Sequence, residues 1–115
     1  MNHEHMNQEM QQCIQNCQEC HRVCLHKAMS HCLEMGGKHT EPNHFRLMMD
    51  CAQICQTSAD FMLRGSAHSA HVCAECADIC EACAQSCEAV GGMEECVAAC
   101  RKCAESCRQM ATMSM

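Results

Sequence analysis

The hydrophobic positions of this chain recur in alternating steps of three and four residues, and cysteine occupies most of them. Three such series lie at residues 13–24, 73–87 and 96–107. On an α-helix these steps place side chains on one face, where a helical bundle normally carries Leu or Ile. The positions between them are largely Gln, Glu, Asp, Lys, Arg and Ala, which suit a solvated face. The pattern therefore predicts helices whose inward faces are lined by thiols.

Glycine and proline divide the chain into four such segments. Gly-Gly pairs at 36–37 and 91–92, Pro42 and Gly65 mark the boundaries. The helices that we expect span residues 7–35, 42–64, 67–90 and 93–112. Short connections make consecutive helices antiparallel neighbours. We therefore predict an all-α fold, an antiparallel up-down-up-down four-helix bundle with a cysteine-lined core, formed by residues 1–115 as a single domain.

Methionine and histidine mostly continue the inward stripes where cysteine stops. The stripe positions outside the three series are Met6, Met10, Lys27, His31, Met35, His44, Met48, Cys51, Cys55, Ser58, Met62 and Met110. Cys32 lies one position off the stripe of the first helix, beside His31. Ordinary core residues are scarce, because Leu, Ile, Val and Phe together number thirteen, against 16 Cys and 12 Met. This indicates that bound metal, as well as hydrocarbon burial, stabilises the fold.

Charge and composition exclude several classes of partner. The net charge is −6, and the chain has neither Trp nor Tyr. We therefore expect no binding of nucleic acid, which requires a basic surface and is often assisted by aromatic stacking. The first residues lack the basic and apolar segments of a secretory signal, and no run approaches the roughly 20 apolar residues of a membrane span. These features predict a cytoplasmic protein, whose thiols stay reduced.

Inert packing and disulfide bonds explain the cysteines less well than metal binding does. A buried Cys is often a small hydrophobe, but it buries little area, and a core of Cys is less stable than one of Leu. Thiols three or four residues apart on a helix have Cβ atoms about 5–6 Å apart, whereas a disulfide needs about 3.5–4.5 Å. Bridges between helices remain an alternative, although four parallel rows of thiols specify no unique pairing.

Cu(I) is the metal that this pattern favours. Structural zinc sites usually take Cys-x2-Cys pairs from turns, and Fe–S runs end in Cys-Pro, whereas Pro42 lies far from every cysteine series. Cu(I) is soft and prefers thiolate and thioether ligands, so the Met extensions fit it as well. The candidate ligands are Cys13, Cys17, Cys20, Cys24, Cys32, Cys51, Cys55, Cys73, Cys76, Cys80, Cys83, Cys87, Cys96, Cys100, Cys103, Cys107, His31, Met35, His44 and Met48.

With these stripes in place, the chain resembles the bacterial copper storage proteins of the cytosolic branch. The most specific stretches are RLMMDCAQIC at 46–55 and CAECADICEAC at 73–83, and the resemblance covers essentially the whole chain. It implies storage of many Cu(I) ions inside the bundle, a cytosolic location and a homotetramer. The chain departs from the family further along the first helix and at the start of the second. Family members tend to carry cysteines at these places, whereas this chain has Lys27, His31 and His44. We expect a lower capacity at that end, partly compensated by Cys32.

Two other functions remain as alternatives. The first is a general soft-metal sink, similar to metallothionein, that takes Zn(II) or Cd(II). The second is a structural or redox module that works through disulfides. We do not expect an enzyme, because the nine His have no nucleophile or carboxylate partner at motif spacing. The expected partners are copper ions, a copper chaperone or chelator, and further copies of the chain.

The two ends of the predicted bundle differ in chemistry. One holds both Gly-Gly turns, and the residues expected close to them are His31, Cys32, Met35, His39, His44, Met48, Cys87, Met93 and Cys96. The other holds both termini, the Gly65 turn and the apolar run at 61–63, which we expect to act as a plug. We therefore expect Cu(I) to enter at the end with the Gly-Gly turns. The Met and His residues near the termini leave the opposite direction as the alternative.

Overall fold

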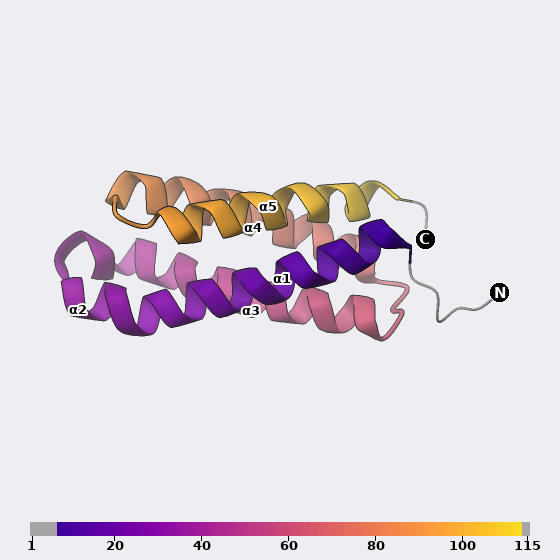
Figure 1. Ribbon diagram of the computed structural model, residues 1–115, viewed down its shortest axis with the longest axis horizontal. Coiled ribbons are helices and arrows are strands. Elements are labelled where there is room, and N and C mark those ends of the chain that lie inside the picture. The colour runs from indigo at the N-terminus through magenta and orange to yellow at the C-terminus, as the bar shows by residue number, and fades with distance from the viewer. Residues whose placement is uncertain (1–6, 114–115) are drawn as a thin grey trace.

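Four helical segments run up and down in the computed structural model, which describes residues 7–113 (Figure 1). The first segment comprises α1 (Gln8–Lys27), a π-helical turn (Ala28–Cys32) and the short α2 (Leu33–Met35). The others are α3 (Pro42–Leu63), α4 (Ser69–Val90) and α5 (Glu94–Thr112), and a 3-10 turn (Gly37–Thr40) precedes α3. The predicted bundle is confirmed, and its helix bounds agree within two residues. Met6, expected to begin the first stripe, lies outside the described residues.

Local capping explains where the helices begin and end. The Asn7 side chain accepts a hydrogen bond from the Met10 backbone N–H at 2.7 Å, which satisfies a donor that the first turn of α1 leaves free. Pro42 occupies the first turn of α3, where its missing N–H costs nothing. Gly91 ends α4 with a φ of 85°, a backbone conformation that glycine adopts without steric cost. The turn residues identified in the sequence therefore set the element boundaries.

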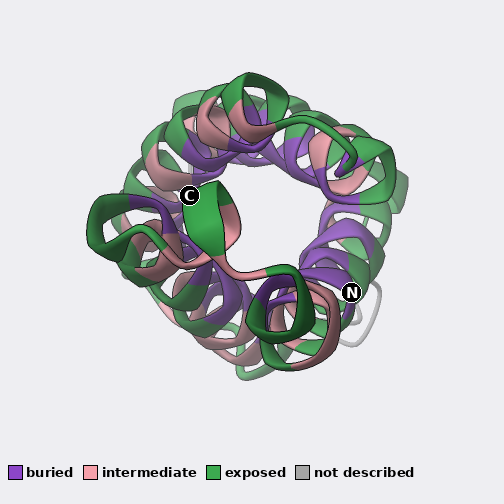
Figure 2. Ribbon diagram, turned by 90° about the vertical axis from the view of Figure 1, so that its left-hand side faces the viewer, coloured by how far each residue is buried: buried purple, intermediate pink, exposed green. Residues whose placement is uncertain are grey.

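The helices form a closed ring around one long core. α1 packs against α3 and α5, and α4 packs against the same two helices from the opposite side. Figure 2 shows the buried residues along the inner faces of the ring and the exposed residues outside. The bundle measures 52 × 20 × 19 Å. None of the helices in the described part of the chain is long and apolar enough to cross a membrane.

The core is made chiefly of sulfur-bearing side chains. All sixteen cysteines are fully buried, with an exposed fraction of 0%. The stripe predicted for α3 is confirmed at every position, because its six members are all buried. Met110 extends the stripe of α5 into the core as predicted. Cysteine therefore occupies the place that larger aliphatic residues hold in an ordinary bundle.

The first helical segment departs from its predicted stripe after Cys24. The prediction continued the stripe through Lys27, His31 and Met35, but Ala28 and Cys32 are the buried residues there. The cause is the π-helical turn, which contains one residue more than an α-helical turn and so shifts the inward face by one position. Lys27 instead forms an ion pair with Glu95 on the outside, and Met35 is 60% exposed.

The two ends of the bundle are arranged as the sequence predicted. The turns at 36–37 and 91–92 lie at one end, on the left in Figure 1, which we call the Gly-Gly end. The Gly65 turn, the start of α1 and the end of α5 mark the other, which we call the terminal end. The predicted apolar plug there is only partly present, because Leu63 is 51% exposed and Phe61 lies under the Arg64 guanidinium. Met62 alone of that run is buried in the core.

Candidate metal centre

The inward thiols lie close to one another from all four helical segments. Sulfur–sulfur contacts include Cys24 with Cys100 at 3.5 Å and Cys103 with Cys107 at 4.0 Å. These contacts join residues far apart in sequence, as in Cys55 with Cys103 at 3.7 Å. All sixteen cysteines are free thiols. The helical phase of each cysteine series therefore produces a continuous column of thiols along the bundle axis.

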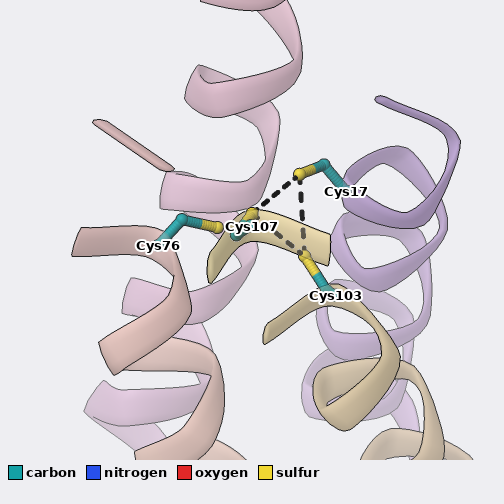
Figure 3. Close-up of side chains that lie close together, drawn as sticks. All are labelled: Cys17, Cys76, Cys103 and Cys107. Atoms are coloured by element: carbon teal, nitrogen blue, oxygen red, sulfur yellow. Dashed lines mark hydrogen bonds between the residues drawn. The ribbon is translucent and has the colours of Figure 1, made fainter. Parts of the chain in front are cut away.

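Four groups of thiols could each hold a metal ion. Within each group, all sulfur atoms lie within 4.8 Å of one another. The groups are Cys17, Cys76, Cys103 and Cys107 (Figure 3); Cys20, Cys24, Cys51 and Cys100; Cys20, Cys55, Cys80 and Cys103; and Cys13, Cys73 and Cys107. Cys20, Cys103 and Cys107 each belong to two groups. Because members are shared, the groups form one connected ladder of potential ligands.

The spacing of the thiols suits direct binding of soft metal ions. A metal–sulfur bond of about 2.3 Å places two sulfurs of a tetrahedral site about 3.8 Å apart. The observed separations of Cys17 from Cys107 and of Cys17 from Cys103, both 3.6 Å, are close to that value. An ion can therefore be accommodated with small side-chain movements. The shared thiols further allow one sulfur to bridge two ions, which a set of isolated zinc sites does not require.

Contacts between the thiols shift their pKa values in opposite directions. A hydrogen bond with Cys100 is the main reason that the pKa of Cys24 falls to about 2. A hydrogen bond with Cys83 likewise lowers the pKa of Cys87 to about 4. Burial raises the pKa of Cys32, which makes its sulfur contact with a thioether. These contacts favour the thiolate form of some ligands over others, and an arriving cation displaces protons from the thiols that it binds.

Three thiols near the Gly-Gly end contact the sulfur of a methionine. Four cysteines belong to none of the groups described above: Cys32, Cys83, Cys87 and Cys96. Cys87 donates to the Met48 thioether at 3.4 Å, and Cys83 contacts the same sulfur at 3.7 Å. Cys32 donates to the Met93 sulfur at 3.8 Å. The column therefore combines thiols with thioethers at this end, and it also does so near the terminal end, where Cys73 donates to the Met62 thioether at 3.8 Å.

Three histidines cluster beyond these thioethers. His44 is 4% exposed, and the rings of His31 and His39 meet edge to face with centroids 5.0 Å apart. Each of the three has a buried ring nitrogen without a hydrogen-bond partner among the described residues. Burial and the neighbouring His31 lower the pKa of His39, which favours its neutral form. Neutral imidazole nitrogens are metal ligands, so the cluster adds nitrogen donors to this end.

The predicted ligand set is largely brought together, with one exception and one omission. All sixteen cysteines, His44 and Met48 are in the core, and His31 stands at its edge. Met35 points to solvent and lies apart from the other predicted ligands. Met93 is buried against Cys32; the sequence placed it near the Gly-Gly turns, but it was not among the predicted ligands. The three-residue step from Met93 to Cys96 was the signal that could have identified it.

Comparisons with known proteins agree with this geometry. A curated relative, the uncharacterized cysteine-rich protein YhjQ of Bacillus subtilis (strain 168), is 38% identical over 71 residues, 62% of this chain and 65% of that protein. The crystal structure of the Nmul_A1745 protein from Nitrosospira multiformis is 61% identical, with a TM-score of 0.90 over 92% of this chain and 97% of that one. The Cu(I)-bound copper storage protein BsCsp3 is 37% identical, with a TM-score of 0.84 over 91% of this chain and all of that one (100%).

The family match covers nearly the whole chain. Residues 6–112 match the family described as copper storage protein. That span includes all sixteen cysteines and every helix of the bundle. The family is one of metal stores, in agreement with the expectation that the chain is not an enzyme. On the evidence of its thiol column, its fold and this match, the chain belongs to the copper storage protein family.

Proposed function

We propose that this chain stores Cu(I) in the column of thiols inside the bundle. The observation that carries the proposal is the set of sixteen buried free thiols, twelve of which form groups that are linked to one another by shared sulfurs. Soft thiolates select Cu(I), and bridging by shared thiolates lets many ions occupy one continuous core. The Cu(I)-bound state of the related BsCsp3 supports the choice of metal.

The proposed ligands are all sixteen cysteines, with His31, His44 and Met48 at the Gly-Gly end. Met35 leaves the set because its side chain is exposed, and Met93 takes its place beside Cys32. The thioethers and imidazoles are neutral donors and hold Cu(I) less tightly than thiolates do. The affinity of the ligands for Cu(I) therefore increases from the Gly-Gly end, where they exchange readily, to the middle of the bundle.

Anaerobic titration of the reduced protein with Cu(I) against a competing chelator tests the storage function. We expect binding of roughly one Cu(I) per thiol, about sixteen ions per chain, because bridged thiolates and Cu(I) balance their charges near that ratio. The same titration with Zn(II) is the control. Saturation at four ions or fewer would contradict storage and would indicate a structural metal site.

A general sink for Zn(II) or Cd(II) is the second candidate. It is favoured by the three groups of four thiols, whose sulfurs converge from different helices as tetrahedral ions require. The thioethers of Met48 and Met93 that contact the thiols are, however, poor ligands for Zn(II). Zn(II) bound as tightly as Cu(I), at the same number of ions per thiol, would favour this alternative.

Copper passes through the Gly-Gly end in this proposal. Two pockets open there, one of about 340 Å³ lined by Cys87, Gly92 and Met93 among others, and one of about 240 Å³ lined by His44 and Ser86. His31, His39 and His44 stand outside the methionines, which in turn contact the outermost thiols. Such an order offers an ion successively stronger ligands on its way inward.

The remaining expectations rest on the family resemblance. We propose that the protein acts in the cytosol, receives copper from a chaperone or a small chelator, and assembles as a homotetramer. Several large apolar side chains lie exposed on the outer faces, among them Met29, Leu33 and Met49, and such an assembly would bury them. Sedimentation at micromolar concentration distinguishes four chains from one.

A further inference from the structure

His44 is held in a conformation that leaves one of its nitrogens available. It lies in the first turn of α3 and is 4% exposed. Its Nδ1 lies 2.7 Å from the Ser86 Oγ of α4, a short hydrogen bond that fixes the plane of the ring. Its Nε2 is buried and has no hydrogen-bond partner in the described part of the chain. The ring is therefore oriented by one nitrogen while the other is free to bind.

This arrangement is the one that metal-binding histidines generally use. A histidine ligand commonly donates its second ring N–H to a neighbouring acceptor, which sets the tautomer and the ring orientation. If Nδ1–H donates to the Ser86 hydroxyl, Nε2 carries a lone pair and no proton. A buried polar atom left without a partner is unfavourable, and a bound ion would supply that partner. Ser86 thus orients the imidazole ring whose Nε2 has no hydrogen-bond partner among the described residues.

Soft sulfur ligands lie next to His44 along both helices. Met48 is one turn further along the same face of α3 and is fully buried. Its Sδ lies 3.4 Å from the Cys87 Sγ, and Cys87 directly follows Ser86 in α4. The imidazole of His44 also acts electrostatically on the Cys87 thiol. One nitrogen and two sulfurs are thus gathered where α3 and α4 meet at the Gly-Gly end.

We propose that His44 Nε2, Met48 Sδ and Cys87 Sγ form a mixed nitrogen–sulfur site for one Cu(I) ion, and that Ser86 positions His44 for it. The inference rests on the proposed storage function and deepens it. None of these three residues belongs to the all-thiol groups, so the site is separate from them. Ser86 is a positioning residue, because it touches the imidazole and not the ion.

The charges of these ligands suit a buried position. One thiolate neutralises Cu(I), and the thioether and imidazole add donor atoms without adding charge. Burial of a neutral complex costs much less than burial of a net charge. In the all-thiol groups, by contrast, several thiolates must share each cation or retain protons. The mixed site therefore holds its ion without needing a second copper beside it, as a site for exchange requires.

NMR of the histidine side chains tests this site directly, because Cu(I) is diamagnetic. Long-range proton–nitrogen spectra of the full chain are recorded without copper and after saturation with Cu(I), while bound copper is counted on the same samples. We expect the His44 Nε2 resonance to shift on loading and Nδ1 to remain protonated. In Ser86→Ala the ring should lose its single tautomer and the shift on loading should shrink. Ser86→Thr, which keeps the hydroxyl, should restore both.

Ser58→Ala serves as the matched control, since Ser58 is a fully buried serine of the same bundle core, distant from His44 along α3. It should leave the His44 spectrum unchanged. A wild-type protein that binds its full complement of copper without any shift at His44 Nε2 overturns the mixed site and leaves the storage function intact. An unchanged tautomer and shift in Ser86→Ala overturns the role of Ser86. A low copper count in the wild type instead contradicts storage itself.

Discussion

Two buried methionines of α3 allow the packing role of the side chain to be distinguished from the metal-binding role of its sulfur atom. Met48 and Met62 are both buried in the core, and each thioether accepts a hydrogen bond from a thiol, at 3.4 Å from Cys87 and 3.8 Å from Cys73. Met48 faces the Gly-Gly end and Met62 the terminal end. Leucine has similar volume and no sulfur, so its substitution for methionine preserves packing at a cost usually below about 1.5 kcal/mol. The pair therefore reports on the direction of copper movement.

Replacement of Met48 by Leu should slow copper exchange, whereas the same change at Met62 should not. Loss of one thioether from the path should reduce the rate of Cu(I) removal by a strong chelator about tenfold, equivalent to about 1.4 kcal/mol in the barrier. Stopped-flow transfer to the chelator measures the rate, and total copper shows that capacity is nearly unchanged. A slower rate in Met62→Leu with a normal rate in Met48→Leu would place the opening at the terminal end.

The π-helical turn at Ala28–Cys32 is the element that adds a sixteenth thiol to the core. Cys32 follows Cys24 by eight residues, and a regular helix advances about 100° per residue, so eight residues would carry Cys32 off the inward face. The wide turn absorbs one of those residues, after which Cys32 faces inward and contacts Met93. π-Helical turns often mark such functional insertions.

Deletion of Ser30 should therefore convert this turn to regular α-helix and keep Cys32 in the core. Ser30 lies within the turn, and its hydroxyl donates a hydrogen bond to the His26 carbonyl one turn back. We expect helix content by circular dichroism and copper capacity to stay at wild-type values. Deletion of the exposed Gln18 is the control, because it should rotate Cys13 and Cys17 out of the core and lower capacity by on the order of two ions. Loss of capacity on deletion of Ser30 would contradict this account of the turn.

At the scale of the whole molecule, copper is the component that completes the core. A bundle lined by cysteine buries less apolar area than one lined by leucine, so hydrophobic burial alone stabilises it less. The closed ring of helices and its capped ends nevertheless define the fold without metal. Ions that bind only the native thiol column add their binding free energy to its stability.

The copper-loaded protein should melt well above the apo protein. One site at a free Cu(I) concentration about a hundred times its Kd adds about 2.7 kcal/mol, which for a chain of this size corresponds to more than about 10 °C in Tm. Apo protein should remain helical, because neutral Cys packs as a small hydrophobe. Thermal scans by circular dichroism, before and after removal of copper by a chelator, measure both. Superimposable melting curves would show that copper binds outside the core.

The helices and the thiol-lined faces could be predicted because both are local properties of the chain. Glycine and proline interrupt helices through backbone geometry that needs no tertiary context, and a regular spacing of Cys13, Cys17 and Cys20 defines a face as soon as a helix forms. Stripe positions in the regular helices, such as Ser58 and Met110, were buried as predicted. The sequence by itself thus determined the bundle, its cysteine core and the soft-metal chemistry that this core favours.

Tertiary structure decided which residues meet where the helical repeat is broken or where the chain turns. The π-helical turn moved Met35 to solvent and brought Cys32 inward, because a change of one residue in a turn alters the phase of everything after it. Contacts between helices paired Cys32 with Met93 and His44 with Ser86, residues separated by 61 and 42 positions. Periodicity describes the face of one helix, whereas such pairs depend on how two helices are placed together. That placement is set by the packing of the whole bundle.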